Sequence, residues 1–188
     1  MTPFSRELLD FWFGPPPHAT RAEWFKKDPR LDATIRARYG NSIEDALAGA
    51  TPPADRDVFD ALAHVVLLDQ FTRNAFRDTP RSFAGDALAL ATAVSVVDAG
   101  GDVRLDRFER LFLYLPFEHA EDLPMQERAV ALFRRLADET GDRDQLEWAE
   151  KHAAIIRRFG RYPHRNAILG RTSTSEEIAF LERPGSRF

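Results

Sequence analysis

The sequence contains no cysteine among its 188 residues. This absence excludes disulfide bonds, thiolate metal sites and cysteine nucleophiles, and it suits a reducing compartment. Lysine is scarce too: it supplies three of the 26 basic residues, an arginine excess typical of a GC-rich genome. The net charge of −4 and the pI of about 5.8 argue against nonspecific nucleic-acid binding.

Long apolar runs are absent as well. The longest uninterrupted one, residues 111–117, has seven residues and includes Pro116, whereas a bilayer span needs about 20. The beginning of the sequence places Glu7 where a signal peptide would carry its apolar stretch, and no cleavage site of small residues follows. We therefore expect a cytoplasmic protein with no membrane partner.

A convincing alternating pattern, which would indicate β-strands, is also lacking. Apolar residues instead recur at helical spacing, and proline and glycine separate the segments. We expect an all-α fold: a compact array of seven to nine antiparallel helices in a single domain, 1–188. The expected helices run from Pro3 to about Gly14, Asp28 to about Leu47, Asp55 to about Arg77, Ser82 to Val97, Leu105 to about Pro116, Asp122 to Gly141, Asp144 to Phe159, and onward from Thr174.

The most apolar of these helices carries a polar group of residues at 68–74. Asp69 and Arg73 are i, i+4 neighbours on it, and so are Gln70 and Asn74. An unpaired charge in such a helix would cost several kcal/mol, so Asp69 must find Arg73 or another cation. One interpretation is a structural ion pair and amide network that ties helices together. The other is that this helix forms the floor of a polar pocket.

A second group surrounds His119. Glu118, Glu121 and Asp122 flank this imidazole, and nearby carboxylates would raise its pKa. A histidine beside carboxylates can act as an acid or base or bind a metal. The alternative is an exposed acidic turn in which Asp122 caps the following helix, and the sequence leaves both open.

The third group is a basic stretch, 151–175, which contains no acid. It carries a net charge of +6, while the rest of the chain carries −10. Its arginines alternate with aromatic residues around a glycine–proline turn, and guanidinium groups suit carboxylate or phosphate. A solvated basic face is the simpler interpretation, and His152, on an apolar stripe, is interpreted as a core histidine. The charged and histidine members are Lys151, His152, Arg157, Arg158, Arg161, His164, Arg165 and Arg171.

Several familiar chemistries have no motif here. The chain lacks a glycine-rich phosphate loop, a Gly-x-Ser-x-Gly elbow and a His-Glu-x-x-His pair. No two histidines show helical ligand spacing, so we expect neither a metal nor a cofactor. A metal site would form only if the fold gathered His119, His152, His164, Glu118 and Glu121.

These segments resemble a bacterial family known only as domain of unknown function 924. The likeness spans nearly the whole chain and implies a compact helical fold similar to the tetratricopeptide-repeat superfamily. It brings no established reaction. The motifs that carry it are Asp-Phe-Trp-Phe-Gly at 10–14, Trp-Phe at 24–25, Leu-Asp-Gln-Phe-Thr-Arg-Asn at 68–74, Tyr-Leu-Pro-Phe-Glu-His-Ala-Glu at 114–121, and 152–171 with Phe-Gly-Arg-Tyr-Pro-His-Arg-Asn at its centre.

Three hypotheses follow. The leading one is a pocket that binds a small anion, a carboxylate or a phosphate, with a histidine able to move a proton. The second is a helical-repeat module whose basic groove binds an acidic peptide. The third is a buried polar network that only fixes helix order. The expected ligand-binding residues are Gln70, Arg73, Asn74, Arg161, Arg165, Asn166 and Arg171, and the catalytic candidates are Asp69, Glu118, His119 and His164.

Overall fold

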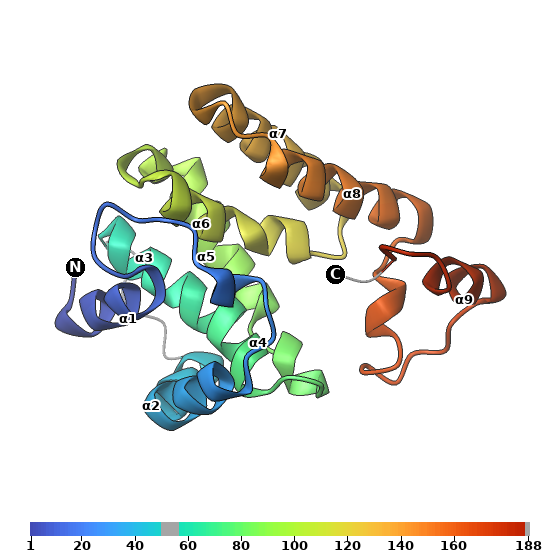
Figure 1. Ribbon diagram of the computed structural model, residues 1–188, viewed down its shortest axis with the longest axis horizontal. Coiled ribbons are helices and arrows are strands. Elements are labelled where there is room, and N and C mark those ends of the chain that lie inside the picture. Colours follow the sequence, from blue (N-terminus) through green and yellow to red (C-terminus); the bar gives the residue numbers. More distant parts are fainter. Residues whose placement is uncertain (50–56, 187–188) are drawn as a thin grey trace.

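The computed structural model describes residues 1–49 and 57–186 (Figure 1). No strand occurs in these two ranges, and the all-α prediction is confirmed. None of the described helices is both long enough and apolar enough to cross a bilayer. The α-helices are α1 Pro3–Phe13, α2 Pro29–Leu47, α3 Val58–Val65, α4 Thr72–Ala75, α5 Asp86–Asp98, α6 Arg107–His119, α7 Leu123–Thr140, α8 Asp144–Phe159 and α9 Ser175–Leu181.

The helix starts follow the capping residues in the sequence. Side-chain oxygens of Thr2, Asp28 and Asp122 accept backbone N–H groups at the starts of α1, α2 and α7. A capping box opens α9. The predicted cap Asp55 lies outside the described residues, and Asp57 caps α3.

Aromatic side chains form the centre of the main core. Trp12 of α1 packs edge-on against Phe71 and Phe112, with ring centroids 5.4 Å apart in both pairs. A second, smaller hydrophobic cluster forms around Ile155, Ile156 and Tyr162 in the C-terminal part of the chain. Helices α6, α7 and α8 follow one another through short turns and pack side by side, and the C-terminal segment, red in Figure 1, lies beside the end of α6.

The predicted long helix at 55–77 is central and buried, but it is not a uniform α-helix. Between α3 and α4 the backbone widens into a π-helical segment, η2 (Val66–Phe71), whose residues are all buried. The Thr72 hydroxyl donates to the carbonyl of Leu67, five residues back, across this widened turn. Such π segments are rare and are frequently found at functional sites. This one carries Asp69 and Gln70.

Pro116 does not stop the helix that contains it. The sequence predicts a stop or kink there, whereas α6 continues through Pro116 to His119. A proline inside a helix costs one backbone hydrogen bond, and here every residue from 111 to 118 is buried, which outweighs that loss. Glu118 and His119 therefore occupy the last turn of α6 rather than a loop.

The start of α5 lies four residues later than the sequence predicts. Ser82 belongs to a short 3-10 segment, η3 (Pro80–Phe83), and α5 begins at Asp86. Gly85 precedes it and packs directly on the π segment: a Cβ atom at Gly85 would lie 2.2 Å from the carbonyl oxygen of Leu68. The absence of a side chain at Gly85 thus brings Asp86 close to η2.

Candidate functional site

A buried carboxylate, Asp69, organises the polar residues of the core. Its side chain is fully buried, and its two oxygens accept from three side chains. The His119 Nδ1 lies 2.6 Å from Oδ1, Gln70 Nε2 donates to Oδ2 at 2.6 Å, and Arg73 Nη2 donates to Oδ1 at 3.5 Å. Burial alone would raise the pKa of Asp69, but His119 and Arg73 outweigh burial and hold that pKa well below its usual range.

His119 is held in one orientation by this carboxylate. Burial and the Arg73 charge lower the pKa of His119, so the ring is neutral at pH 7 and its Nδ1–H donates to Asp69. The side chain keeps 17% of its surface exposed. Its other ring nitrogen, Nε2, has no hydrogen bond within the described ranges. A neutral imidazole fixed in this way has the arrangement of a general base.

Two arginines share a second carboxylate beside this pair. Arg73 Nη2 donates to Asp86 Oδ1 at 2.8 Å, and Arg165 Nη1 donates to Asp86 Oδ2 at 3.4 Å. Both guanidinium groups also lie over the ring of Phe83. The distance from Cζ to the ring centroid is 5.2 Å for Arg73 and 4.8 Å for Arg165. The Arg165 side chain is 8% exposed, and burial together with the Arg73 charge lowers its pKa to about 10.

Glu118 and His152 form a buried pair that is neutral at pH 7. Glu118 is 4% exposed, and burial, aided by Asp69, raises its pKa to about 8. His152 Nδ1 lies 3.1 Å from Glu118 Oε1 and 2.9 Å from the carbonyl of Trp148, and burial lowers the pKa of His152 to about 3. His152 is thus a buried histidine, as its apolar stripe predicts. At pH 7 neither Glu118 nor His152 is charged.

Tyr162, in the C-terminal segment, contacts both members of this pair. Its ring packs edge-on against His152, with centroids 5.6 Å apart, and at a tilt against His164 at 5.4 Å. Its hydroxyl donates to the carbonyl of Glu118, and Arg165 lies over its ring. Burial and the Arg165 charge lower the pKa of His164 to about 4. His164 therefore packs at the edge of the cluster in neutral form, and its role in catalysis stays a prediction.

The raised pKa of Glu118 predicts an unusual pH dependence. Between about pH 4.5 and 8 the folded chain keeps a proton on Glu118 that the unfolded chain releases, so this group's contribution to stability falls as pH rises. Glu118→Gln removes that loss. Urea unfolding should give equal free energies for variant and wild type near pH 4, and a gain of several kcal/mol for the variant near pH 9.

Glu121→Gln is the matched control for this measurement. Arg171 and the Tyr162 N–H hold the pKa of Glu121 below its usual range, so its folded form is stabilised at high pH and the substitution should destabilise the protein near pH 9. A loss of stability for Glu118→Gln at that pH would mean that Glu118 is charged and paired, contrary to the assignment.

Four of the predicted ligand-binding residues lie outside this cluster. Arg161 donates to both oxygens of Glu177, at 2.7 and 2.8 Å, and Arg171 makes a paired contact with Glu121. Asn166 accepts from Arg171 and donates to Ser173 and Glu177. Asn74 donates to the carbonyl of Gln70 and accepts from Arg77.

Four of the five arginines in the acid-free stretch pair with acids that lie outside it. These acids are Asp86 in α5, Glu121 in the turn after α6, and Glu176 and Glu177 in α9. The fifth arginine, Arg157, is exposed and has no ion pair among the described residues. Three of the predicted binding residues belong to the cluster: Gln70, Arg73 and Arg165. Three of the catalytic candidates also belong to it: Asp69, Glu118 and His119.

Three members of the cluster were not predicted as site residues. Asp86 looks like an ordinary first-turn acid of α5, Phe83 like a core aromatic, and Tyr162 like one of several aromatics in the basic stretch. Gly85, which allows α5 to pack on the π segment, lies inside the helix that the sequence predicts from Ser82, so the sequence gives no local signal of this contact.

A surface hollow lies elsewhere on the molecule, among the segment at 20–25, α6, α7 and the start of α8. Trp24, Phe108, Phe133 and Leu136 are among its lining residues. None of the residues of the Asp69 cluster lines it, so the two features are separate.

Comparison with known proteins identifies the family. The family described as bacterial protein of unknown function (DUF924) matches residues 8–185. The chain belongs to this family. The solved structure of another protein of unknown function, from Agrobacterium tumefaciens, is 37% identical, covers 95% of this chain and 97% of its own, and superposes with a TM-score of 0.85. No curated protein matches the chain. The family and its helical fold are therefore established, while the function has to be argued from the site.

Proposed function

We propose that this chain is a cytoplasmic protein that binds a small anion, a carboxylate or a phosphate, between Arg73 and Arg165, next to His119. The observation that carries the proposal is that the Arg165 guanidinium has few hydrogen-bond acceptors. This side chain is 8% exposed, yet its one hydrogen bond in the described part of the chain is a long one, 3.4 Å to Asp86. The Phe83 and Tyr162 rings also contact it, but a buried guanidinium with so few hydrogen-bond acceptors is costly unless a ligand supplies them.

The neighbouring Arg73 supports the same conclusion. The Nε–H groups of Arg73 and Arg165 are both buried, and neither has a hydrogen-bond partner among the described residues. The two positive charges are close enough for Arg73 to lower the pKa of Arg165. An anion between them would accept from unsatisfied donors and offset the repulsion of like charges. Guanidinium groups bind carboxylate and phosphate oxygens through paired hydrogen bonds.

His119 adds the means to move a proton. Asp69 fixes the Nδ1–H tautomer, which leaves Nε2 as a proton acceptor on a partly exposed edge of the cluster. A ligand held by Arg73 would lie near this ring, since Arg73 donates to the carboxylate that also binds His119. Acid–base chemistry on the bound anion is therefore part of the proposal, with His119 as the acid–base group.

The competing hypothesis is a tetratricopeptide-repeat-like module with a basic groove for an acidic peptide. Such a groove needs several free cations along one face. Arg161 and Arg171, two of the strongest candidates for it, are paired with Glu177 and Glu121. These pairings favour a small ligand at one point over an extended peptide.

The test is thermal unfolding with added inorganic phosphate or acetate at constant ionic strength. A ligand at about 100 times its Kd stabilises the folded state by about 2.7 kcal/mol, which corresponds to a rise in Tm of about 5–10 °C for a chain of this size. Arg165→Met should abolish the rise. Asp86 keeps its 2.8 Å contact with Arg73 in this variant, so we expect the variant to fold with a lower Tm, and its response to anions is measured from its own Tm without anion.

Arg157→Met is the matched control, since it removes an exposed arginine from the same acid-free stretch. It should keep the full response. The proposal fails if neither anion raises the Tm of the wild type, or if Arg165→Met responds as the wild type does. Stabilisation by an acidic peptide, without any by phosphate or acetate, would favour the competing hypothesis.

A further inference from the structure

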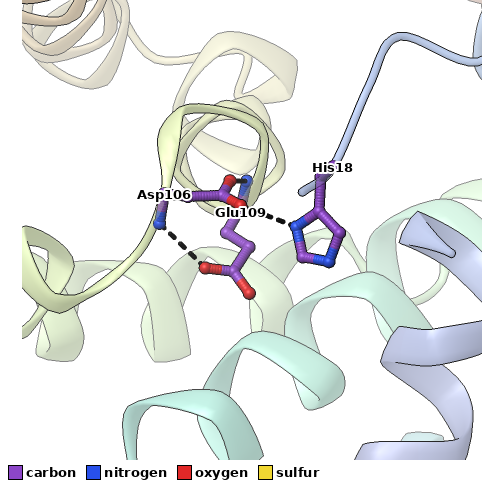
Figure 2. Close-up of side chains that lie close together, drawn as sticks. All are labelled: His18, Asp106 and Glu109. Atoms are coloured by element: carbon purple, nitrogen blue, oxygen red, sulfur yellow. Dashed lines mark hydrogen bonds and ion pairs between the residues drawn. The ribbon is translucent and has the colours of Figure 1, made fainter. Parts of the chain in front are cut away.

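Three side chains of metal-binding type meet at the start of α6, away from the Asp69 cluster. They are His18, Asp106 and Glu109 (Figure 2). One donor atom of each lies within 4.8 Å of a donor atom of the other two. None of them takes part in the proposed anion site, so this feature can be tested independently of it.

His18 is held in place by the segment that follows α1. Its ring stacks on Phe13, with centroids 5.2 Å apart and an interplanar angle of 30°, and its side chain is 12% exposed. Its Nδ1 lies 2.6 Å from Asp106 Oδ2. The ring is thus positioned before any ligand binds, which lowers the entropic cost of using it as a ligand.

The two carboxylates form the capping box of α6. Each uses one oxygen for the cap, so the second oxygen of each takes no part in it. Asp106 Oδ1 accepts from the N–H groups of Phe108 and Glu109, and Glu109 Oε2 accepts from the N–H of Asp106. Asp106 Oδ2 faces His18. Glu109 Oε1 has no hydrogen bond within the described ranges, although Glu109 is 8% exposed. A carboxylate oxygen without a donor, on a largely buried side chain and beneath the His18–Asp106 pair in Figure 2, is an open ligand position.

The electrostatics favour a cation there. The N-terminus of a helix carries about half a positive charge, which two carboxylates more than offset. Their remaining oxygens face the same small space, and a divalent cation would relieve their mutual repulsion.

We propose that His18, Asp106 and Glu109 bind a divalent transition-metal ion, with Zn²⁺ as the reference case. One imidazole with two carboxylates matches the ligand preference of zinc, whereas magnesium and calcium take oxygen ligands. Zinc bonds to these atoms are about 2.0–2.2 Å long, so two ligand atoms on a tetrahedral zinc lie about 3.3–3.6 Å apart. The spacing of up to 4.8 Å therefore requires side-chain shifts of about 1–1.5 Å on binding, and Asp106, 43% exposed, has room to move. Such a site does not show in the sequence, because 88 residues separate His18 from Asp106.

The test is a titration of the full chain with Zn²⁺ followed by calorimetry, and with Co²⁺ followed by its visible absorption. Wild type should bind one ion at the site. Glu109→Gln should weaken binding at least tenfold, because glutamine keeps the capping box but lacks the anionic ligand. His18→Gln should weaken metal binding to a similar extent. It should also change the visible absorption of bound Co²⁺, because the nitrogen ligand is lost.

Glu139→Gln is the matched control: Glu139 is an exposed carboxylate paired with Arg110, and its loss should leave metal affinity unchanged. Thermal unfolding without metal checks that the variants are folded. The proposal is overturned if the wild type binds neither ion at millimolar concentration, or if the folded Glu109→Gln and His18→Gln variants bind as tightly as the wild type.

Discussion

Replacing Asp69 by alanine should cost about 3–5 kcal/mol of unfolding free energy, the usual penalty for breaking a buried ion pair from one side. Asp69 is fully buried and accepts from His119, Gln70 and Arg73. Without Asp69, the one carboxylate that still pairs with Arg73 is Asp86, and Asp86 also pairs with Arg165. The Gln70 amide and the His119 Nδ1–H lose their acceptor at the same time.

Urea unfolding at pH 7 measures this effect, and Asp98→Ala is the matched control. Asp98 also pairs with an arginine, Arg128, but its side chain is 59% exposed, so its removal should change stability by about 0.5 kcal/mol or less. A loss for Asp69→Ala no larger than that of the control would show that the cluster carries little energy.

Gly85→Ala should be the most damaging of the glycine-to-alanine changes. The added Cβ would lie 2.2 Å from the carbonyl oxygen of Leu68 and 2.8 Å from its carbonyl carbon. These are backbone atoms of the π segment and cannot rotate away. Overpacking of this kind costs about 1–3 kcal/mol, and we expect the upper end because α5 must move off η2. That movement would also draw Asp86 away from Arg73.

Gly40→Ala separates this clash from the general effect of replacing glycine. Gly40 lies inside α2, and a Cβ there meets nothing within 4 Å, so the change should stabilise the protein by about 0.5–1 kcal/mol. Thermal unfolding of both variants makes the comparison. A Gly85→Ala variant as stable as Gly40→Ala would contradict the close packing of α5 on the π segment.

The helical fold was largely readable from the sequence because capping residues and helix-breaking residues act locally. Thr2, Asp28 and Asp122 begin helices where the sequence predicts them. Pro116 shows the limit of such rules. Its effect on the backbone is local, but the buried surface that carries α6 past it comes from packing with other helices.

The candidate site was readable only where apolar context forces a partner. Asp69, in the most apolar helix, had to meet a cation, and Arg73 lies one turn away. His119 also contacts it, from 50 residues along the chain. The basic stretch is the opposite case: its arginines looked available, yet the acids that neutralise Arg161 and Arg171 lie outside it. Pairing between distant segments has no signature in one sequence.

Nitrogen-15 NMR of the arginine and histidine side chains during a phosphate titration tests the anion site most directly. The buried Nε–H groups of Arg73 and Arg165 have no acceptor among the described residues, so phosphate should shift both resonances downfield and saturably, and shift the Nε2 signal of His119 with the same affinity. The signal of Arg157 serves as the exposed reference and should not move. Saturable shifts at Arg73, Arg165 and His119 are the predicted result. Shifts confined to exposed arginines, with those of Arg73 and Arg165 unchanged up to high phosphate, would contradict the account.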